Sequence, residues 1–138
     1  MVHGNVGDSR VYWLPDLGAG DPLQLSLDDS VAQVRMEMGV SREEAENGPQ
    51  AHAITKWLGR DSPDFRPRTG AVTVTGPGWL LVCSDGLWNY VSEATDLQAL
   101  VAQLGAGQVD PLPLANALVA WANAQGGKDN ITAALARL

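Results

Sequence analysis

Residues 79–84, with the sequence Trp-Leu-Leu-Val-Cys-Ser, constrain the fold of this chain more than any other stretch. The run is apolar at nearly every position, whereas a strand with one face in water alternates apolar and polar residues. It therefore predicts a strand that is buried on both faces. Asp85 and Gly86 follow at once, so this strand should bring a carboxylate to its end before the chain turns.

Further elements follow from the spacing of apolar residues and from turn residues. Strands are predicted at 5–14 (with a polar interruption at 7–10), 23–27, 71–75 and 130–138. Helices are predicted at 28–39, 41–48, 93–105 and from 110 to 121. Gly-Pro-Gly at 76–78 favours a β-hairpin between the strands on either side of it. This order of elements predicts an α+β fold with mainly antiparallel sheets.

Length and composition limit the classes of partner. The chain has 138 residues, of which 45% are hydrophobic, enough for one domain with a core. A net charge of −7 argues against nucleic acid and against an anionic membrane as the main partner. One cysteine and no apolar run of about 18 residues fit a chain in a reducing cytoplasm that does not cross a membrane.

Two kinds of catalytic site are disfavoured by the residues present. A cysteine-dependent phosphatase needs an Arg six residues after its Cys, but Asn89 occupies that position relative to Cys83. Cys83 also lies within the apolar run, where cysteine behaves as a small buried hydrophobic residue. His3 and His52 are far apart in the chain, so a zinc site built on histidines is not indicated.

Three aspartates are the remaining candidates for chemistry. Asp8, Asp85 and Asp129 each lie at the edge of a predicted strand with glycine nearby. Any one of them alone is typical of a turn residue that accepts a hydrogen bond from its own backbone. Together they offer hard oxygen ligands without soft partners, which suits Mg²⁺ or Mn²⁺. Their spacing alone does not show that they converge.

Five motifs, in order along the chain, resemble those of the metal-dependent serine/threonine protein phosphatases, known as type 2C or PPM. They are GNVGDSRVYWL at 4–14, LQLSLDDS at 23–30, AITKWLG at 53–59, LLVCSDGLW at 80–88 and GGKDNIT at 126–132. The resemblance covers essentially the whole chain, which matches the C-terminal portion of the family domain. Residues 1–138 are thus expected to be a partial phosphatase domain.

The resemblance implies a four-layer α-β-β-α sandwich with two Mg²⁺ or Mn²⁺ ions between its sheets, and a third ion in some members. Asp85 and Asp129 correspond to metal ligands, and Asp8 corresponds to a ligand of the looser third ion. Gly86 and Asn130 accompany the two aspartates within these motifs. Asn89 stands where the family often has an Asp for the third ion, and it supplies an amide oxygen without charge.

The implied activity is hydrolysis of phosphoserine or phosphothreonine in a protein substrate by a metal-activated water. Residues 28–59 correspond to the mobile flap beside the active site. The family's Asp-Gly-His-Gly segment and phosphate-binding Arg are not found in these 138 residues. We therefore expect the chain alone to be inactive, and to be marginally stable or self-associating. Two alternatives remain, namely a non-catalytic protein-binding module and a simple divalent-cation-binding domain.

Overall fold

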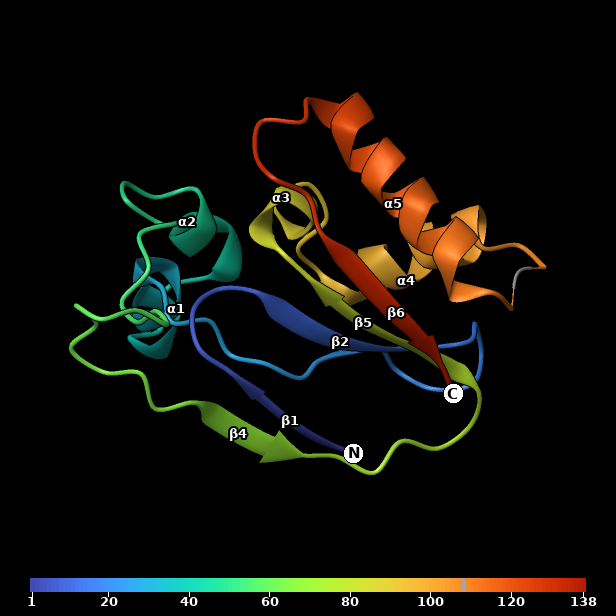
Figure 1. Ribbon diagram of the computed structural model, residues 1–138, viewed down its shortest axis with the longest axis horizontal. Coiled ribbons are helices and arrows are strands. Elements are labelled where there is room, and N and C mark those ends of the chain that lie inside the picture. Colours follow the sequence, from blue (N-terminus) through green and yellow to red (C-terminus); the bar gives the residue numbers. More distant parts are fainter. Residues whose placement is uncertain (108) are drawn as a thin grey trace.

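The computed structural model describes residues 1–107 and 109–138 and is built on two antiparallel sheets. The larger sheet has the strand order β3 (Leu23–Gln24), β2 (Arg10–Pro15), β5 (Gly78–Cys83) and β6 (Ala133–Arg137). The smaller sheet is a ribbon of β1 (Val2–Asn5) and β4 (Arg68–Ala71), which lies on the side of β2 away from α4 and α5 (Figure 1). The predicted α+β class with antiparallel sheets is confirmed.

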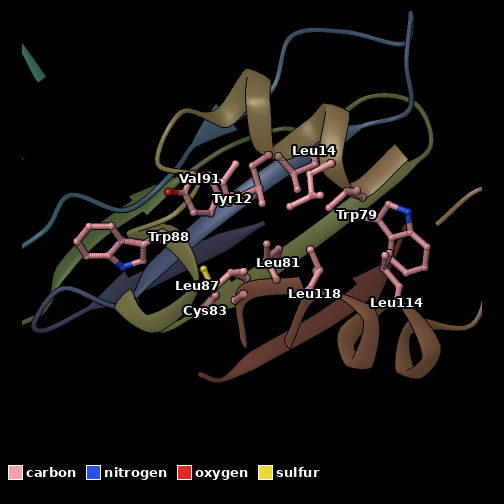
Figure 2. Close-up of a cluster of buried hydrophobic side chains, with 14 residues drawn as sticks. Tyr12, Leu14, Trp79, Leu81, Cys83, Leu87, Trp88, Val91, Leu114 and Leu118 are labelled. Carbon is pink, nitrogen blue, oxygen red and sulfur yellow. The ribbon is translucent and has the colours of Figure 1, made fainter. Parts of the chain in front are cut away.

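Two helices cover one face of the larger sheet and enclose the main core (Figure 1). They are α4 (Ala94–Leu104) and α5 (Pro111–Gln125). The core is apolar and tightly closed, because Tyr12, Leu81 and Leu118 are all 0% exposed. Figure 2 shows this cluster extending from Trp88 at one end to Trp79 at the other.

Helix α5 begins and ends where its sequence signals lie. Asp110 caps the start, where its carboxylate accepts a hydrogen bond from the backbone N–H of Leu112 (3.0 Å), and Pro111 occupies the first helical position. The helix continues through Trp121 to Gln125, and it ends at Gly126, the first of the two glycines at 126–127 that the sequence offers as a stop. Among the described residues, no helix combines the length and apolar character that crossing a membrane requires.

The two central strands differ in how fully they are buried. All six residues of β2 are buried, Arg10 included. On β5, Leu81 and Cys83 face the helices, but Val82 on the opposite face is 41% exposed. The prediction that residues 79–84 are buried on both faces is therefore wrong at Val82. Strand β5 packs on β2, β6 and α3, and these contacts leave part of its second face open.

The hairpin predicted around Gly-Pro-Gly at 76–78 is wrong, and so is the single strand at 5–14. Strand β4 pairs with β1, whereas β5 pairs with β2 and β6, so the chain changes sheets between β4 and β5. The Pro77 carbonyl accepts a hydrogen bond from Asp16 N–H (3.0 Å), which places this turn against the end of β2. The polar interruption at 7–10 is likewise the point where the chain leaves β1 and enters β2.

A helical lobe, defined here as residues 30–54, lies beside the end of the larger sheet near α3 (Figure 1). It contains α1 (Val31–Glu37) and α2 (Arg42–Glu46), and a bridge between Ser30 and Ile54 closes it. Ser30 and Ser41 cap the two helices by accepting from backbone N–H groups three residues later (3.2 and 3.3 Å). Its own core is small, with three buried alanines: Ala32, Ala45 and Ala51.

Candidate metal-binding edge

Asp85 lies where β5 ends and a one-turn helix, α3 (Asp85–Trp88), begins. The sequence indicated a turn here, and the structure has a helical turn that carries Asp85 in its first residue. Ser84 joins this end of β5 to the segment before β6. Its hydroxyl donates to the Asn130 carbonyl (3.0 Å) and accepts from Thr132 N–H (3.0 Å). The start of α3 is therefore fixed to the loop that follows α5.

Asp129 is carried by that same loop, and the two segments touch. A Cβ atom added at Gly86 would lie 2.4 Å from the Asn130 carbonyl oxygen, so only glycine permits this approach. The Asp129 carboxylate accepts from Asn130 N–H (2.7 Å) and is exposed to solvent. The main chains of Gly86 and Asn130 thus keep Asp85 and Asp129 on adjoining segments.

Asp8 lies on the turn between β1 and β2, and three hydrogen bonds with two distant residues, Asp29 and Trp88, hold that turn. Gly7 N–H donates to the Asp29 carboxylate (3.2 Å), and Asp29 N–H donates to the Gly7 carbonyl (2.8 Å). The indole N–H of Trp88 donates to the Asp8 carbonyl (2.9 Å). Partial burial, and then the nearby charge of Asp85, raise the pKa of Asp8 above its ordinary value. Asp8 and Asp85 are therefore electrostatic neighbours.

A cavity of about 390 Å³ lies at the opposite end of the sheet, and a second, of about 330 Å³, opens beside Asp129. The second cavity separates the helical lobe from α3 and the loop before β6. Its lining residues are Glu46, Asn47, His52, Gly86, Trp88, Asn89, Tyr90, Lys128 and Asp129. Asn89 is exposed and shares this cavity with Asp129. Asp8 lies near Asp85, and Asp85 and Asp129 lie on adjoining segments, so the name aspartate edge is used for the segments that carry these three residues. The second cavity opens beside Asp129.

The three carboxylates do not by themselves surround one point. Within residues 1–107 and 109–138, no group of three or more His, Cys, Asp or Glu side chains lies close enough to hold a metal ion. The expectation that all three converge on one metal–water cluster is thus met only in part, as they share an edge without forming a three-ligand group. Cys83 is excluded from nucleophilic chemistry, because burial raises the pKa of its thiol to about 12.

A buried charged network behind this edge escaped sequence analysis. The guanidinium of Arg10, which is 1% exposed, donates to Asp28 (2.7 Å from Nη2), to Glu46 (2.8 Å) and to the Ser92 hydroxyl (2.9 Å). It also stacks on the indole of Trp88, 3.6 Å from the ring centroid. The helix predicted at 28–39 begins only at Val31, because Ser30 is its cap and Asp28 is the buried partner of Arg10.

The comparisons with known proteins agree on one group. No protein-family model matches the chain. Protein phosphatase PhpP of Streptococcus pneumoniae is 34% identical over 139 residues, which cover 97% of this chain and 51% of PhpP. The serine/threonine phosphatase structure from S. agalactiae has a TM-score of 0.78 and 32% identity, covering 97% of this chain and 52% of its own.

The structure of the PPM Ser-Thr phosphatase MsPP from Mycobacterium smegmatis, in complex with cacodylate, superposes with a TM-score of 0.74 at 33% identity. The match covers 97% of this chain and 54% of MsPP. The chain belongs to the PPM phosphatase family. It spans about half the length of the relatives it matches and corresponds to their C-terminal portion. Within this PPM chain, the first, fourth and fifth motifs carry Asp8, Asp85 and Asp129.

The donor atoms at the aspartate edge fit a hard divalent cation. Asp8, Asp85 and Asp129 offer carboxylate oxygens, and Asn89 offers an amide oxygen, without sulfur or imidazole among them. The pKa of Asp8 is raised first by partial burial and then by the nearby charge of Asp85, and a cation between the two carboxylates would offset that charge. Another PPM relative, the catalytic domain of PstP, was solved in complex with 2 manganese ions, at 25% identity and a TM-score of 0.67.

Proposed function

We propose that this chain is the part of a protein serine/threonine phosphatase domain that holds Mg²⁺ or Mn²⁺ through Asp85 and Asp129, with Asp8 serving a third ion. The observation that carries the proposal is the contact between Gly86 and Asn130, which keeps the two aspartates on adjoining segments beside a cavity of about 330 Å³. A cation bound there would activate water and offset charge on a phosphate ester. The substrate class is phosphoserine or phosphothreonine in proteins.

The helical lobe fits the role of the flap that the family resemblance implies for residues 28–59. It supplies Glu46, Asn47 and His52 to the cavity wall opposite α3. A phosphorylated segment of a protein would enter between this wall and the aspartate edge. Among the described residues, Arg10 is the buried cationic side chain, and it is not free to clamp a phosphate because Asp28 and Glu46 occupy it.

Cation binding is the direct test. We would titrate Mn²⁺ into the chain and into Asp85→Asn and Asp129→Asn by calorimetry, with Asp110→Asn as the matched control. Asp110 is an exposed Asp at the start of α5, and Asn preserves helix capping. Each site variant should bind Mn²⁺ at least about tenfold more weakly, since a charged ligand is lost. Equal affinity in all four proteins would refute the assignment of these ligands.

Activity is the second measurement. We expect negligible turnover of p-nitrophenyl phosphate and of phosphothreonine peptides at millimolar Mn²⁺, because the described residues hold no three-ligand group. Robust turnover that Asp85→Ala abolishes would show instead that these residues assemble a working site unaided. Binding of Mn²⁺ without turnover would be the expected behaviour of half of a PPM domain.

A further inference from the structure

The helical lobe is attached to the sheet mainly by charged groups. Its fully buried core consists of three alanine side chains, which bury little apolar area, with partly buried Met36 and Val40 packed against them. Glu46 of α2 instead accepts three hydrogen bonds at one carboxylate oxygen, from Arg10 (2.8 Å), Ser92 (2.8 Å) and Arg42 (3.1 Å). Hydrogen bonds to charged groups are about twice as strong as neutral ones. Glu46 is therefore the principal anchor of α2.

The same guanidinium also reaches the aspartate edge. Arg10 stacks on the indole of Trp88, and the indole N–H holds the main chain of Asp8 (2.9 Å). Trp88 belongs to α3, the one-turn helix whose first residue is Asp85. One side chain thus contacts both the anchor of the lobe and the ring that positions the turn of Asp8.

Arg10 itself has little freedom to move. Its Nε and Nη2 donate to the two oxygens of Asp28 (2.7 to 3.1 Å), and its Nη1 donates to the hydroxyl of Tyr12 (3.2 Å). Asp28 is 2% exposed, so this pair is buried. The guanidinium plane is therefore fixed, and Glu46 is its most solvent-accessible carboxylate partner, with 15% of its side chain exposed.

We propose that Arg10 is a positioning residue that couples the helical lobe to the Asp8 and Asp85 edge, with Glu46 as the releasable contact. When Glu46 is bound, the lobe is held at a fixed distance across the cavity and Trp88 is held under the guanidinium. When Glu46 is released, α2 moves away from the cavity, and the guanidinium shifts on Trp88 and loosens the turn of Asp8. One of the three measurements that test this coupling, the affinity for Mg²⁺, rests on the proposed function. The other two, amide exchange and the Trp88 resonance, do not.

The test uses Glu46→Ala, with Arg42→Ala as the matched control. Arg42 also donates a hydrogen bond to Glu46, but its side chain is partly exposed. The guanidinium that stacks on Trp88 is that of Arg10. Replacement of Arg10 itself is less informative, since loss of the partner of buried Asp28 can unfold the chain. Glu46→Ala leaves the Arg10–Asp28 pair in place.

Three measurements are made on both variants and the parent chain. They are amide exchange of α1 and α2 against α5, the indole N–H resonance of Trp88 assigned with Trp88→Phe, and Mg²⁺ affinity. In Glu46→Ala, exchange of α1 and α2 should rise about tenfold or more from the loss of charged hydrogen bonds. The Trp88 resonance should shift, and Mg²⁺ should bind severalfold more weakly. Arg42→Ala should leave the Trp88 resonance in place.

Faster exchange of the lobe with an unchanged Trp88 resonance would overturn the coupling, since Glu46 would then only fasten α2. A Trp88 shift of equal size in Arg42→Ala would overturn the role of Arg10, because the effect would come from general loosening. If the parent chain binds no Mg²⁺, the proposed function fails, while the exchange and resonance data still decide whether Arg10 couples the two regions.

Discussion

The sheet core and the helical lobe of this chain are held together by different physical means. In the core, large apolar side chains from β2, β5, α4 and α5 exclude water and are nearly fully buried. In the lobe, three alanines make up the buried apolar cluster, and ion pairs of Glu46 with Arg10, Arg42 with Glu93 and Glu37 with Arg68 join it to the rest of the chain. Apolar burial does not depend on pH or on one partner, whereas each ion pair does.

This difference indicates where the molecule can change shape. A region held by a few charged contacts can open while the apolar core stays closed, because local opening requires only those contacts to break. The lobe also borders the cavity beside Asp129. The more adjustable region of the chain is therefore the one that faces the candidate metal-binding edge.

The largest expected effect comes from removing the buried partner of Arg10. Asp28→Ala should lower the free energy of unfolding by about 3–5 kcal/mol, because an unpaired guanidinium is left in a buried site. Urea unfolding followed by tryptophan fluorescence measures this loss. Asp21→Ala, at an exposed position in the connection between β2 and β3, is the control and should unfold like the parent. A small loss of unfolding free energy in Asp28→Ala would mean that charged contacts contribute less to stability beside the lobe than we expect.

A cavity in the apolar core should cost somewhat less. Leu118 is 0% exposed, and Leu118→Ala should destabilise the chain by about 2–5 kcal/mol through lost burial and an unfilled space. Leu112→Ala on the same helix is the control, since Leu112 is 64% exposed. Because one apolar core joins the sheet and the helices, Leu118→Ala should lower the stability of these elements together, and amide exchange would resolve this. Selective loosening of the lobe in this variant would contradict it.

Acid should release the lobe before it unfolds the core. Burial alone would raise the pKa of Glu46, but hydrogen bonds from Arg10 and Ser92 outweigh it and lower the pKa below its ordinary value. The stability that Glu46 contributes is therefore present above the unfolded pKa of about 4.3 and is lost as the pH falls through the lower folded pKa. Amide exchange of α2 between pH 6 and pH 3 would follow this release. Glu46→Gln should remove that step, and an identical pH profile in the variant would count against Glu46 as its origin.

The smallest loss of stability should come from breaking a partly exposed ion pair of the larger sheet, between Arg137 and Asp16. Arg137 donates two hydrogen bonds to Asp16 (2.6 Å each), and these lower the pKa of the Asp16 carboxyl. Both side chains are partly exposed, so Asp16→Asn should cost less than about 1 kcal/mol. Thermal melts at low and high salt would measure the loss. A larger loss would show that charge also holds the core region, which would weaken the contrast with the lobe.

The sequence was informative where its signals are local. Ser41 and Asp110 could be identified as helix caps, and Gly39 as a stop, because each acts on residues next to it. The apolar run before Ser84 likewise predicted β5, and the placement of Asp85 at the end of that strand is confirmed. The role of Asp8, Asp85 and Asp129 in binding metal stays a prediction.

The predictions from sequence failed where the structure depends on partners that are distant in the chain. Gly-Pro-Gly at 76–78 has the composition of a hairpin turn, but pairing of β5 with β2 and β6 overrides that preference. The partners of Arg10 lie 18, 36 and 82 residues away in the chain, at Asp28, Glu46 and Ser92. Apolar periodicity carries no information on such pairs. An Arg beside an apolar strand and two consecutive aspartates before a helix were the available signals.

Because glycine has no side chain, Gly86 sets the distance between the segment of Asp85 and the segment of Asp129. Because the Asn130 carbonyl oxygen occupies the space that a Cβ would need, the main chains of the two aspartate-bearing segments are in direct contact. Repacking of the apolar core can tilt these segments, but it cannot bring them closer. Any larger residue at position 86 would push them apart and move Asp85 away from Asp129. In related chains, a glycine at this position together with both aspartates would therefore report the preserved spacing of the carboxylates, even where the surrounding sequence has diverged.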